Sequence, residues 1–210
     1  MTSHAAFWDR VAQKYATDPI KDMKAYEYTL ARTKTYLGPA DHVLELGCGT
    51  ASTALLIAPG VGHLTATDFS AAMVYIGRQK VEEAEQNNLR VEVRDVEGGL
   101  LPSGPFDAVL AFNLLHLLHD PEKAIARVRG LLKPGGLFIS KTACLQGAYR
   151  MLALPVSAMR LFGKAPKVSF FSTGWLEGAV RRQGFEIIES GDFPKAPPRR
   201  YIVARLKGQT

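Results

Sequence analysis

Two glycines separated by one residue, with a carboxylate further along the chain, are the part of this sequence best suited to chemistry. Gly47 and Gly49 directly follow the apolar run 43–46. Asp68 ends the next strand-like run, 63–67, and follows Gly47 at roughly the 20-residue spacing typical of a carboxylate that binds a ribose. Glycine at such a turn allows a positive φ and lets a ligand approach backbone N–H groups without a Cβ in the way. The pattern predicts a turn that binds an adenosine-containing cofactor.

The residues around this turn favour a cationic cofactor over a dinucleotide. A dinucleotide-binding turn usually has a third glycine or alanine where Ser52 stands. Glu45 lies at the end of the preceding strand, where its carboxylate would repel a pyrophosphate and attract an ammonium group. S-adenosyl-L-methionine has no phosphates and carries a sulfonium and an ammonium, so it is the predicted cofactor. Cys48 is interpreted as a small residue near this cofactor, because no cation beside it in sequence would activate its thiol.

The surrounding sequence alternates between strand-like and helix-like segments from Asp41 onward, after a helix-prone region at 5–36. We expect strands at 43–46, 63–67, 91–94, 107–112, 137–141, 185–189 and 201–206. Helices are expected at 52–58, 71–86, 121–132 and 173–183, with a turn at 133–136. Ser70 and Asp120 precede two of these helices and are predicted N-caps. Strands that alternate with helices imply right-handed crossovers and a mostly parallel sheet.

Five segments, 43–53, 68–73, 94–96, 106–109 and 132–136, occur in an order and at intervals that match a known family. Together they resemble the class I S-adenosylmethionine-dependent methyltransferases, in the small-molecule branch with ubiquinone/menaquinone-type and phospholipid-type enzymes. The resemblance covers roughly 7–138 well and the last third in outline. It implies an α/β fold with a Rossmann-like, doubly wound, mostly parallel seven-stranded sheet and one antiparallel strand.

The same resemblance implies a single domain, 1–210, with four parts. These are an N-terminal helical lid (1–40), a cofactor-binding core (41–142), a helical substrate-cap insertion after the fifth strand (143–172) and a C-terminal helix with strands (173–210). It also implies a set of cofactor-binding residues: Glu45, Gly47, Cys48, Gly49, Asp68, Phe69, Met73, Asp95, Val96, Phe112 and Asn113. In this set Asp68 would bind both ribose hydroxyls and Asp95 the adenine amino group. Ala51 stands where the family often has a third glycine, and alanine fits there if its φ is negative.

Methyl transfer from a sulfonium depends mainly on positioning, and a base is needed only if the acceptor keeps its proton at neutral pH. His116, shortly after the fourth strand, is the candidate general base or substrate donor. Its alternative is a loop histidine that packs at the edge of the sheet. His119 is interpreted as structural. A metal site built from His116, His119 and Asp120 would need rare geometry, so no metal is expected.

Aromatic and basic residues outside the core suggest where the acceptor would bind. Trp8 and Tyr15 share a helix face, which forms either an ordinary core contact or part of the lid. No acidic residue occurs between Lys141 and Glu177, where basic and apolar residues alternate and Tyr149 is a further substrate-contact candidate. This segment could lie on an anionic membrane, cap an apolar acceptor, or simply cover the edge of the sheet. We therefore expect a small, largely apolar, lipid- or quinone-like acceptor.

Composition limits the remaining alternatives. The 210 residues carry a net charge of +6 and only two cysteines, and no run resembles a signal peptide or a membrane span, so a cytoplasmic protein is expected. The charge permits a nucleic-acid methyltransferase, but Asn113 lacks the Pro-Pro-aromatic sequence common after the fourth strand of such enzymes, so no nucleic-acid partner is expected. A nicotinamide-dependent oxidoreductase and a cofactor-binding protein without catalysis remain open, as does the oligomeric state.

Overall fold

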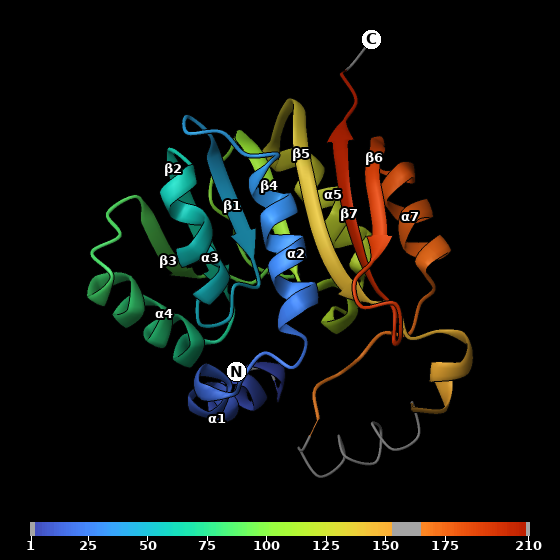
Figure 1. Cartoon of the computed structure of the whole chain (residues 1–210), viewed down its shortest axis with the longest axis horizontal. Helices are drawn as coiled ribbons and strands as arrows, with labels where there is room; N and C mark the ends of the chain where they lie inside the picture. The colour runs from blue at the N-terminus through green and yellow to red at the C-terminus, as the bar shows by residue number, and fades with distance from the viewer. Residues whose placement is uncertain (1–2, 153–164, 209–210) are drawn as a thin grey trace.

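Seven strands form one sheet with helices on both faces in the part of the chain that the computed structural model describes, residues 3–152 and 165–208. The strands lie in the order β3-β2-β1-β4-β5-β7-β6 (Figure 1). They are β1 His42–Leu46, β2 His63–Asp68, β3 Leu89–Val93, β4 Phe106–Phe112, β5 Leu132–Ala143, β6 Phe185–Asp192 and β7 Arg199–Leu206. β7 runs antiparallel to β5 and β6, and the remaining pairs are parallel. The predicted mostly parallel sheet with one antiparallel strand is confirmed.

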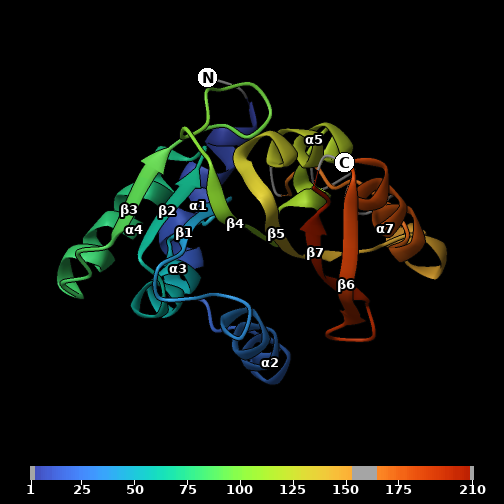
Figure 2. The same cartoon turned by 90° about the horizontal axis from the view of Figure 1, so that it is seen from above.

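The helices are divided between the two faces of this sheet, as Figure 2 shows. They are α1 Ser3–Thr17, α2 Met23–Lys34, α3 Ser52–Ile57, α4 Ala71–Glu83, α5 Pro121–Leu131 and α7 Thr173–Arg182, with short 3-10 helices η1 Ala58–Gly60, η2 Leu115–Leu117 and η3 Gly147–Leu152. On one face, Ala54 of α3 and Val74 of α4 pack into a core cluster with Val43 of β1. On the other face, Ile125 of α5 packs into a second cluster with Leu44 of β1. The two helical layers therefore bury both faces of the central strands.

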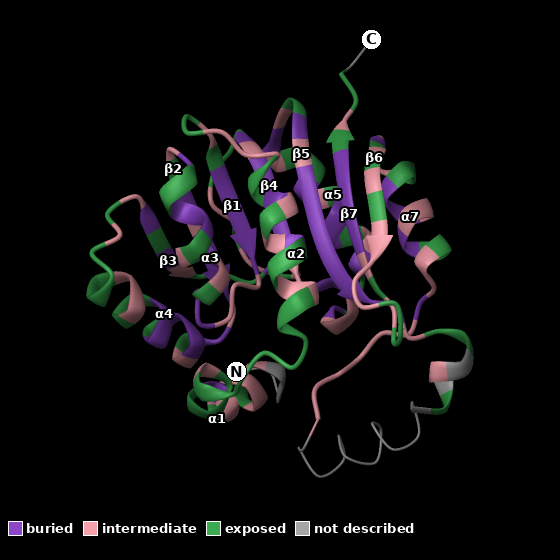
Figure 3. Cartoon of the chain, viewed as in Figure 1, coloured by how far each residue is buried: buried purple, intermediate pink, exposed green. Residues whose placement is uncertain are grey.

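Burial on both sides explains why the central strands read as nearly continuous apolar runs. Successive side chains of a strand point to opposite faces. In β4, Ala108 and Leu110 belong to one core cluster, while Val109 and Ala111 belong to the other. Figure 3 shows the central strands buried and the outer surfaces of the helices exposed.

Most predicted boundaries lie close to the observed ones, and two need correction. Helix α4 ends at Glu83, three residues early, because the chain turns back at Glu85, whose φ is 50°. The predicted turn at 133–136 belongs to β5, which begins at Leu132. Leu132 pairs with Phe106 and Leu137 pairs with Ala108, so the intervening residues form an irregularity within the strand. The Pro-Gly-Gly sequence correctly marks a local irregularity. It does not reveal that β5 pairs with β4 both before and after that irregularity.

Two predicted N-caps fix the start of their helices. The Ser70 side chain accepts a hydrogen bond from the Met73 N–H at 3.2 Å. The Asp120 side chain accepts one from the Lys123 N–H at 2.9 Å, with Pro121 at the first helical position. Such caps satisfy backbone donors that have no partner within the helix. Both predictions are confirmed.

The two N-terminal helices attach to different parts of the core. In α1, the Asp9 carboxylate accepts hydrogen bonds from the Ser70 hydroxyl at 2.6 Å and the Ala72 N–H at 3.2 Å, at the start of α4. Helix α2 lies in front of the middle of the sheet, over β4 and beside β5 (Figure 1). Its Arg32 forms an ion pair with Glu189 of β6. The hydrogen bonds of Asp9 therefore hold helix α1 against the carboxyl ends of β1 and β2.

None of the described helices is long and apolar enough to cross a membrane. Within the same residues, no cluster of three or more histidine, cysteine or acidic side chains could hold a metal ion.

Candidate functional site

The glycine turn after β1 has the open backbone that its sequence predicted. Gly47 has a φ of 67° and Gly49 a φ of 55°. The Cys48 N–H donates to the Thr67 carbonyl at 2.9 Å, and the Gly49 N–H donates to Asp68 Oδ2 at 2.9 Å. The turn is thus tied to the end of β2 by two hydrogen bonds.

Ala51 departs from expectation. Its φ is 57°, and it serves as the N-cap of α3 without a side-chain hydrogen bond. The condition of a negative φ is therefore not met, because the turn keeps the left-handed geometry that a third glycine would adopt without strain. For an L-residue this conformation costs roughly 1–2 kcal/mol. The methyl group is fully buried among α3, α4 and the strands, which offsets part of that cost.

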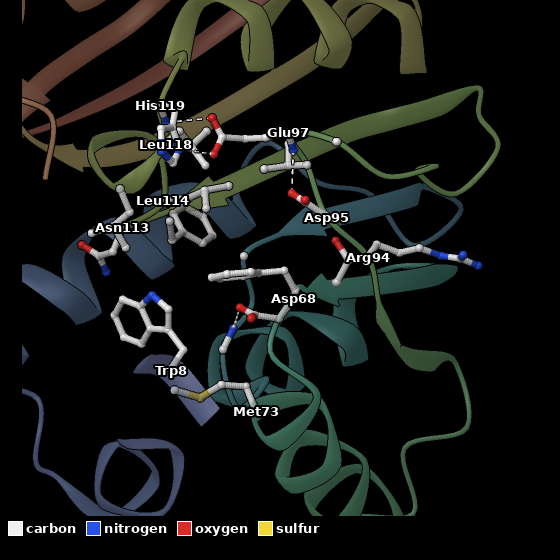
Figure 4. Close-up of a pocket in the computed structure, with 18 of the residues that line it drawn as sticks. Trp8, Asp68, Met73, Arg94, Asp95, Glu97, Asn113, Leu114, Leu118 and His119 are labelled. Carbon is white, nitrogen blue, oxygen red and sulfur yellow. Dashed lines mark hydrogen bonds and ion pairs between the residues drawn. The ribbon is translucent and has the colours of Figure 1, made fainter. Parts of the chain in front are cut away.

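A cleft of about 380 Å³ opens beside this turn, at the carboxyl ends of the parallel strands. Its size lies within the roughly 300–1,000 Å³ typical of ligand pockets. Figure 4 shows side chains from α1, β2, the segment after β3 and the segment after β4 surrounding it. The cleft is lined by Trp8, Tyr15, Gly47, Gly49, Thr67, Asp68, Phe69, Met73, Arg94, Asp95, Val96, Glu97, Gly98, Phe112, Asn113, Leu114, Leu117, Leu118 and His119.

Asp68 lies between the glycine turn and the next helix. Its Oδ2 accepts the Gly49 N–H, and its Oδ1 accepts the Ser70 N–H at 2.9 Å. Burial raises the pKa of this carboxyl, while these backbone donors oppose the shift. Each carboxylate oxygen can accept more than one hydrogen bond. Asp68 is therefore held rigidly with acceptor capacity left toward the cleft that it lines (Figure 4).

Glu45 lies beneath the cleft and does not line it. Its side chain is buried, with only 2% of the residue exposed, and Oε2 has no hydrogen-bond partner among the described residues. Burial, and then the nearby charge of Asp68, raises the pKa of Glu45 to about 8. An unpartnered buried carboxylate is costly, so it fits a ligand that brings a positive group.

Cys48 also lies outside the lining of the cleft. Burial, and then the charges of Glu45 and Asp68, raises the pKa of its thiol well above the usual range. This disfavours the thiolate and agrees with its interpretation as a small residue of the turn.

The wall after β3 contains Asp95 and Val96, as predicted, and also Glu97, which the sequence analysis missed. The Glu97 carboxylate accepts hydrogen bonds from the backbone N–H groups of His119 at 2.7 Å and Asp120 at 3.1 Å. It also contacts His119 Nδ1 at 3.1 Å. This contact joins the segment after β3 to the segment before α5, so His119 lies at the rim of the cleft (Figure 4). Its position two residues after Asp95, a predicted cofactor-binding residue, was the one sequence signal that could have placed Glu97 at the cleft.

The wall after β4 begins with Phe112 and Asn113, both predicted. Asn113 has a φ of 54°, and its N–H donates to the Lys141 carbonyl at 2.6 Å. The chain then turns so that Leu114 covers Gly47. A Cβ added at Gly47 would lie 2.7 Å from Leu114 Cδ1.

Gly47→Ala is therefore expected to lower the free energy of unfolding by about 1–2 kcal/mol from the left-handed backbone alone, and by more from the contact with Leu114. Urea unfolding of Gly47→Ala in the wild type and in a Leu114→Ala background separates the two contributions. Gly130→Ala is the control, because a Cβ there meets nothing within 4 Å. Stability equal to the wild type in both backgrounds would contradict the strain assigned to this turn.

Trp8 and Tyr15 line the cleft from the side of α1. Their rings meet edge to face, with centroids 6.1 Å apart. Burial, followed by the charges of Asp68 and Glu45, raises the pKa of Tyr15. The shared helix face predicted for these residues is therefore turned toward the cleft.

His116 and Tyr149 are not among the residues that line the cleft. His116 Nδ1 is 2.8 Å from the hydroxyl of Thr142, a buried residue of β5. Burial, and then the charge of Arg199, lowers the pKa of His116 to about 4. A general base works best with a pKa near the operating pH, so this geometry does not favour that role. Tyr149 lies on η3.

The expected insertion is described in two pieces. On the near side of the gap, 147–152 forms η3, and on the far side Ser169 attaches to the rim of the cleft. The Ser169 N–H donates to the His116 carbonyl and its hydroxyl to the Leu118 carbonyl, both at 2.7 Å. Several basic residues of the predicted membrane-contact segment, including Arg160 and Lys164, lie outside the described residues.

The sheet order, the left-handed glycine turn after β1 and the buried carboxylate at the end of β2 agree with the fold that the sequence resemblance implied. Residues 43–136 match the family model described as "Methyltransferase domain". Demethylmenaquinone methyltransferases of Listeria welshimeri and Listeria monocytogenes are each 29% identical over 156 residues. These alignments cover 67% of this chain and 62% of the relatives, so the chain spans about three fifths of their length.

Solved structures agree on the fold. The N-methyltransferase NodS of Bradyrhizobium japonicum, in complex with S-adenosyl-L-homocysteine, matches with a TM-score of 0.73 and 15% identity over 98% of this chain and 99% of that chain. A putative methyltransferase bound to the Haloferax volcanii Trm112 activator matches with a TM-score of 0.77 and 17% identity, over 99% and 97%. The chain is thus similar to methyltransferases in sequence over residues 43–136 and in fold over nearly its whole length. The open glycine turn and the unpartnered Glu45 oxygen both fit S-adenosyl-L-methionine, the cofactor predicted from the sequence.

Proposed function

We propose that the protein transfers a methyl group from S-adenosyl-L-methionine to a small, largely apolar acceptor of quinone- or lipid-like chemistry. Two carboxylates carry this proposal. Two backbone donors fix Asp68 in the cleft, and the Glu45 carboxylate near it has no hydrogen-bond partner at Oε2 among the described residues. The demethylmenaquinone methyltransferases among the relatives support the choice of acceptor. The aromatic and leucine side chains that line the cleft are consistent with it.

In this proposal the cofactor spans the cleft from the glycine turn to the wall after β3. Gly47 and Gly49 leave room for the methionine moiety, and Glu45 supplies the negative charge for its ammonium. Asp68 binds the ribose hydroxyls. The adenine lies at the other end, where these residues hold it: Phe69, Met73, Asp95 and Val96. When bound, S-adenosyl-L-methionine supplies a methyl group already activated by its sulfonium.

The acceptor is proposed to enter beside Phe112 and Asn113, under Trp8 and Tyr15 of α1. Residues 1–40 act as a lid, because Asp9 fixes α1 to the start of α4 at the cleft. The described part of the cap proposed at 143–172 includes Ser169, whose hydroxyl attaches it to the rim of the cleft. The protein contributes by holding the acceptor in line with the sulfonium and excluding water, so an acceptor that has already lost its proton needs no base.

The test is incubation of the purified protein with methyl-labelled S-adenosyl-L-methionine and a cell extract, followed by identification of the labelled product. We expect one apolar small molecule to carry the label. Labelled nucleic acid would reject the proposal, and so would the absence of any labelled product. If no product is labelled but the cofactor still binds, the protein is a cofactor-binding protein without catalysis. Calorimetry with NAD distinguishes an oxidoreductase. Binding to anionic liposomes at low salt tests a peripheral membrane contact by the insertion.

A further inference from the structure

Three basic residues lie on neighbouring elements where β5 ends and β7 begins, outside the lining of the cleft but at the same edge of the sheet. Lys141 lies on β5, and His116 is held against Thr142, the next residue of that strand. Arg199 pairs in the sheet with Ala143, one residue further on. Figure 1 shows the end of β5 beside the start of β7, at the same edge of the sheet as α1. We call His116, Lys141 and Arg199 the basic corner.

The basic corner lacks a direct anionic partner among the described residues. The Lys141 ammonium donates to two neutral oxygens of α2, the Ala25 carbonyl at 3.1 Å and the Thr29 hydroxyl at 3.0 Å. Arg199 is exposed, and within the described part of the chain its side chain makes no hydrogen bond or ion pair.

Arg200, the next residue of β7, provides the contrast. Its guanidinium lies 3.4 Å from Glu177 and 3.1 Å from Asp192, on the face covered by α7. The fold therefore neutralises Arg200 and leaves Arg199, which points to the opposite face of the strand, exposed at the end of the sheet that borders the cleft.

The charge of Arg199 lowers the pKa of nearby groups. After burial, it is the next cause that lowers the pKa of His116 to about 4 and that of Lys141 to about 8, although Asp22 opposes the effect at Lys141. It also acts on Tyr15, which lines the cleft. At Tyr15 the charges of Asp68 and Glu45 outweigh that of Arg199, so its positive charge has most effect at His116 and Lys141. A positive charge at the edge of a cleft attracts anions.

We propose that the acceptor carries an anionic oxygen group, and that Arg199 binds it at the basic corner. This inference rests on the proposed function, because it places the anion beside the methyl-transfer site. Arginine suits the role, since its planar guanidinium donates two parallel hydrogen bonds to a carboxylate. The anchoring group would hold an otherwise apolar acceptor in one orientation beneath Tyr15.

The test compares two probes of the same shape, 2-naphthoate and its neutral amide 2-naphthamide. Calorimetry in the presence of S-adenosyl-L-homocysteine should show at least about tenfold tighter binding of the carboxylate to the wild type, which corresponds to the loss of one charged contact. Arg199→Gln should abolish this preference, and Arg199→Lys should restore part of it. Arg205→Gln is the matched control, because Arg205 is an exposed arginine near the opposite end of β7.

The outcomes separate the two proposals. Failure of the wild type to bind S-adenosyl-L-homocysteine rejects the proposed function, whatever the naphthalene probes do. Intact cofactor binding with equal affinity for both probes, or with binding of neither, overturns the basic corner as an acceptor site. So does a preference that survives in Arg199→Gln or disappears in Arg205→Gln.

Discussion

Asp68→Ala is expected to weaken S-adenosyl-L-methionine binding by about 10²–10⁴-fold, because two charged hydrogen bonds of roughly 1.5–3 kcal/mol each are lost at 1.4 kcal/mol per tenfold change. The carboxylate is already oriented by the N–H groups of Gly49 and Ser70. It therefore needs no reorganisation when the ribose binds. Isothermal titration calorimetry at pH 7.5 measures the change directly.

Loss of Asp68 also removes the acceptor of the Gly49 N–H, so the turn itself could loosen. Asp68→Asn addresses this, because one amide oxygen can still accept one of the backbone N–H groups. We expect its melting temperature to exceed that of Asp68→Ala while its cofactor affinity stays far below the wild type. Glu186→Ala, on the exposed side of β6, is the control. Wild-type affinity in a folded Asp68→Ala protein would sink the ribose assignment.

Cofactor binding is expected to strengthen about tenfold per pH unit between pH 5.5 and 7.5, and to release a proton from Glu45. The pKa of this buried carboxyl is raised to about 8, so it is mainly neutral in the free protein over this range. A cationic ligand is held by the ionised form. The ligand's own α-amino group stays charged below roughly pH 7.7 and does not add to the slope. Calorimetry in two buffers of different ionisation enthalpy counts the released protons.

Glu45→Gln is the variant that isolates this effect, since it keeps the shape of the side chain and removes its titration. Its affinity should change little with pH and fall well below the wild type at pH 7.5. The raised pKa also predicts the stability of the cofactor-free protein. A carboxyl that binds its proton more tightly when folded stabilises the fold at pH below about 4.5, and this stabilisation is lost as pH rises toward 8. The wild-type melting temperature should therefore decline over that range more than that of Glu45→Gln. An equally steep affinity slope in both proteins would contradict the role of Glu45.

Features that depend on neighbours along the chain were predictable from the residues alone. The positive φ of Gly47 and Gly49, the N-caps Ser70 and Asp120, and the position of Asp68 at the end of β2 were all predictable. Backbone conformation and capping are local, and the carboxyl ends of parallel strands meet at one edge of a sheet. The cofactor half of the site is built from such ends, so its residues could be predicted in sequence order.

The surroundings and pKa values of the site residues depend on the tertiary structure. Glu97 joined the cleft through contacts with the segment before α5, and Ala51 was held in a glycine-like conformation by the packing around it. His116 contacts Thr142 of β5 outside the cleft, and burial, followed by the charge of Arg199, lowers its pKa. Arg199 reached the same corner from the far end of the chain through the antiparallel pairing of β7. Burial and charge depend on long-range packing, so no local pattern in the sequence carries them.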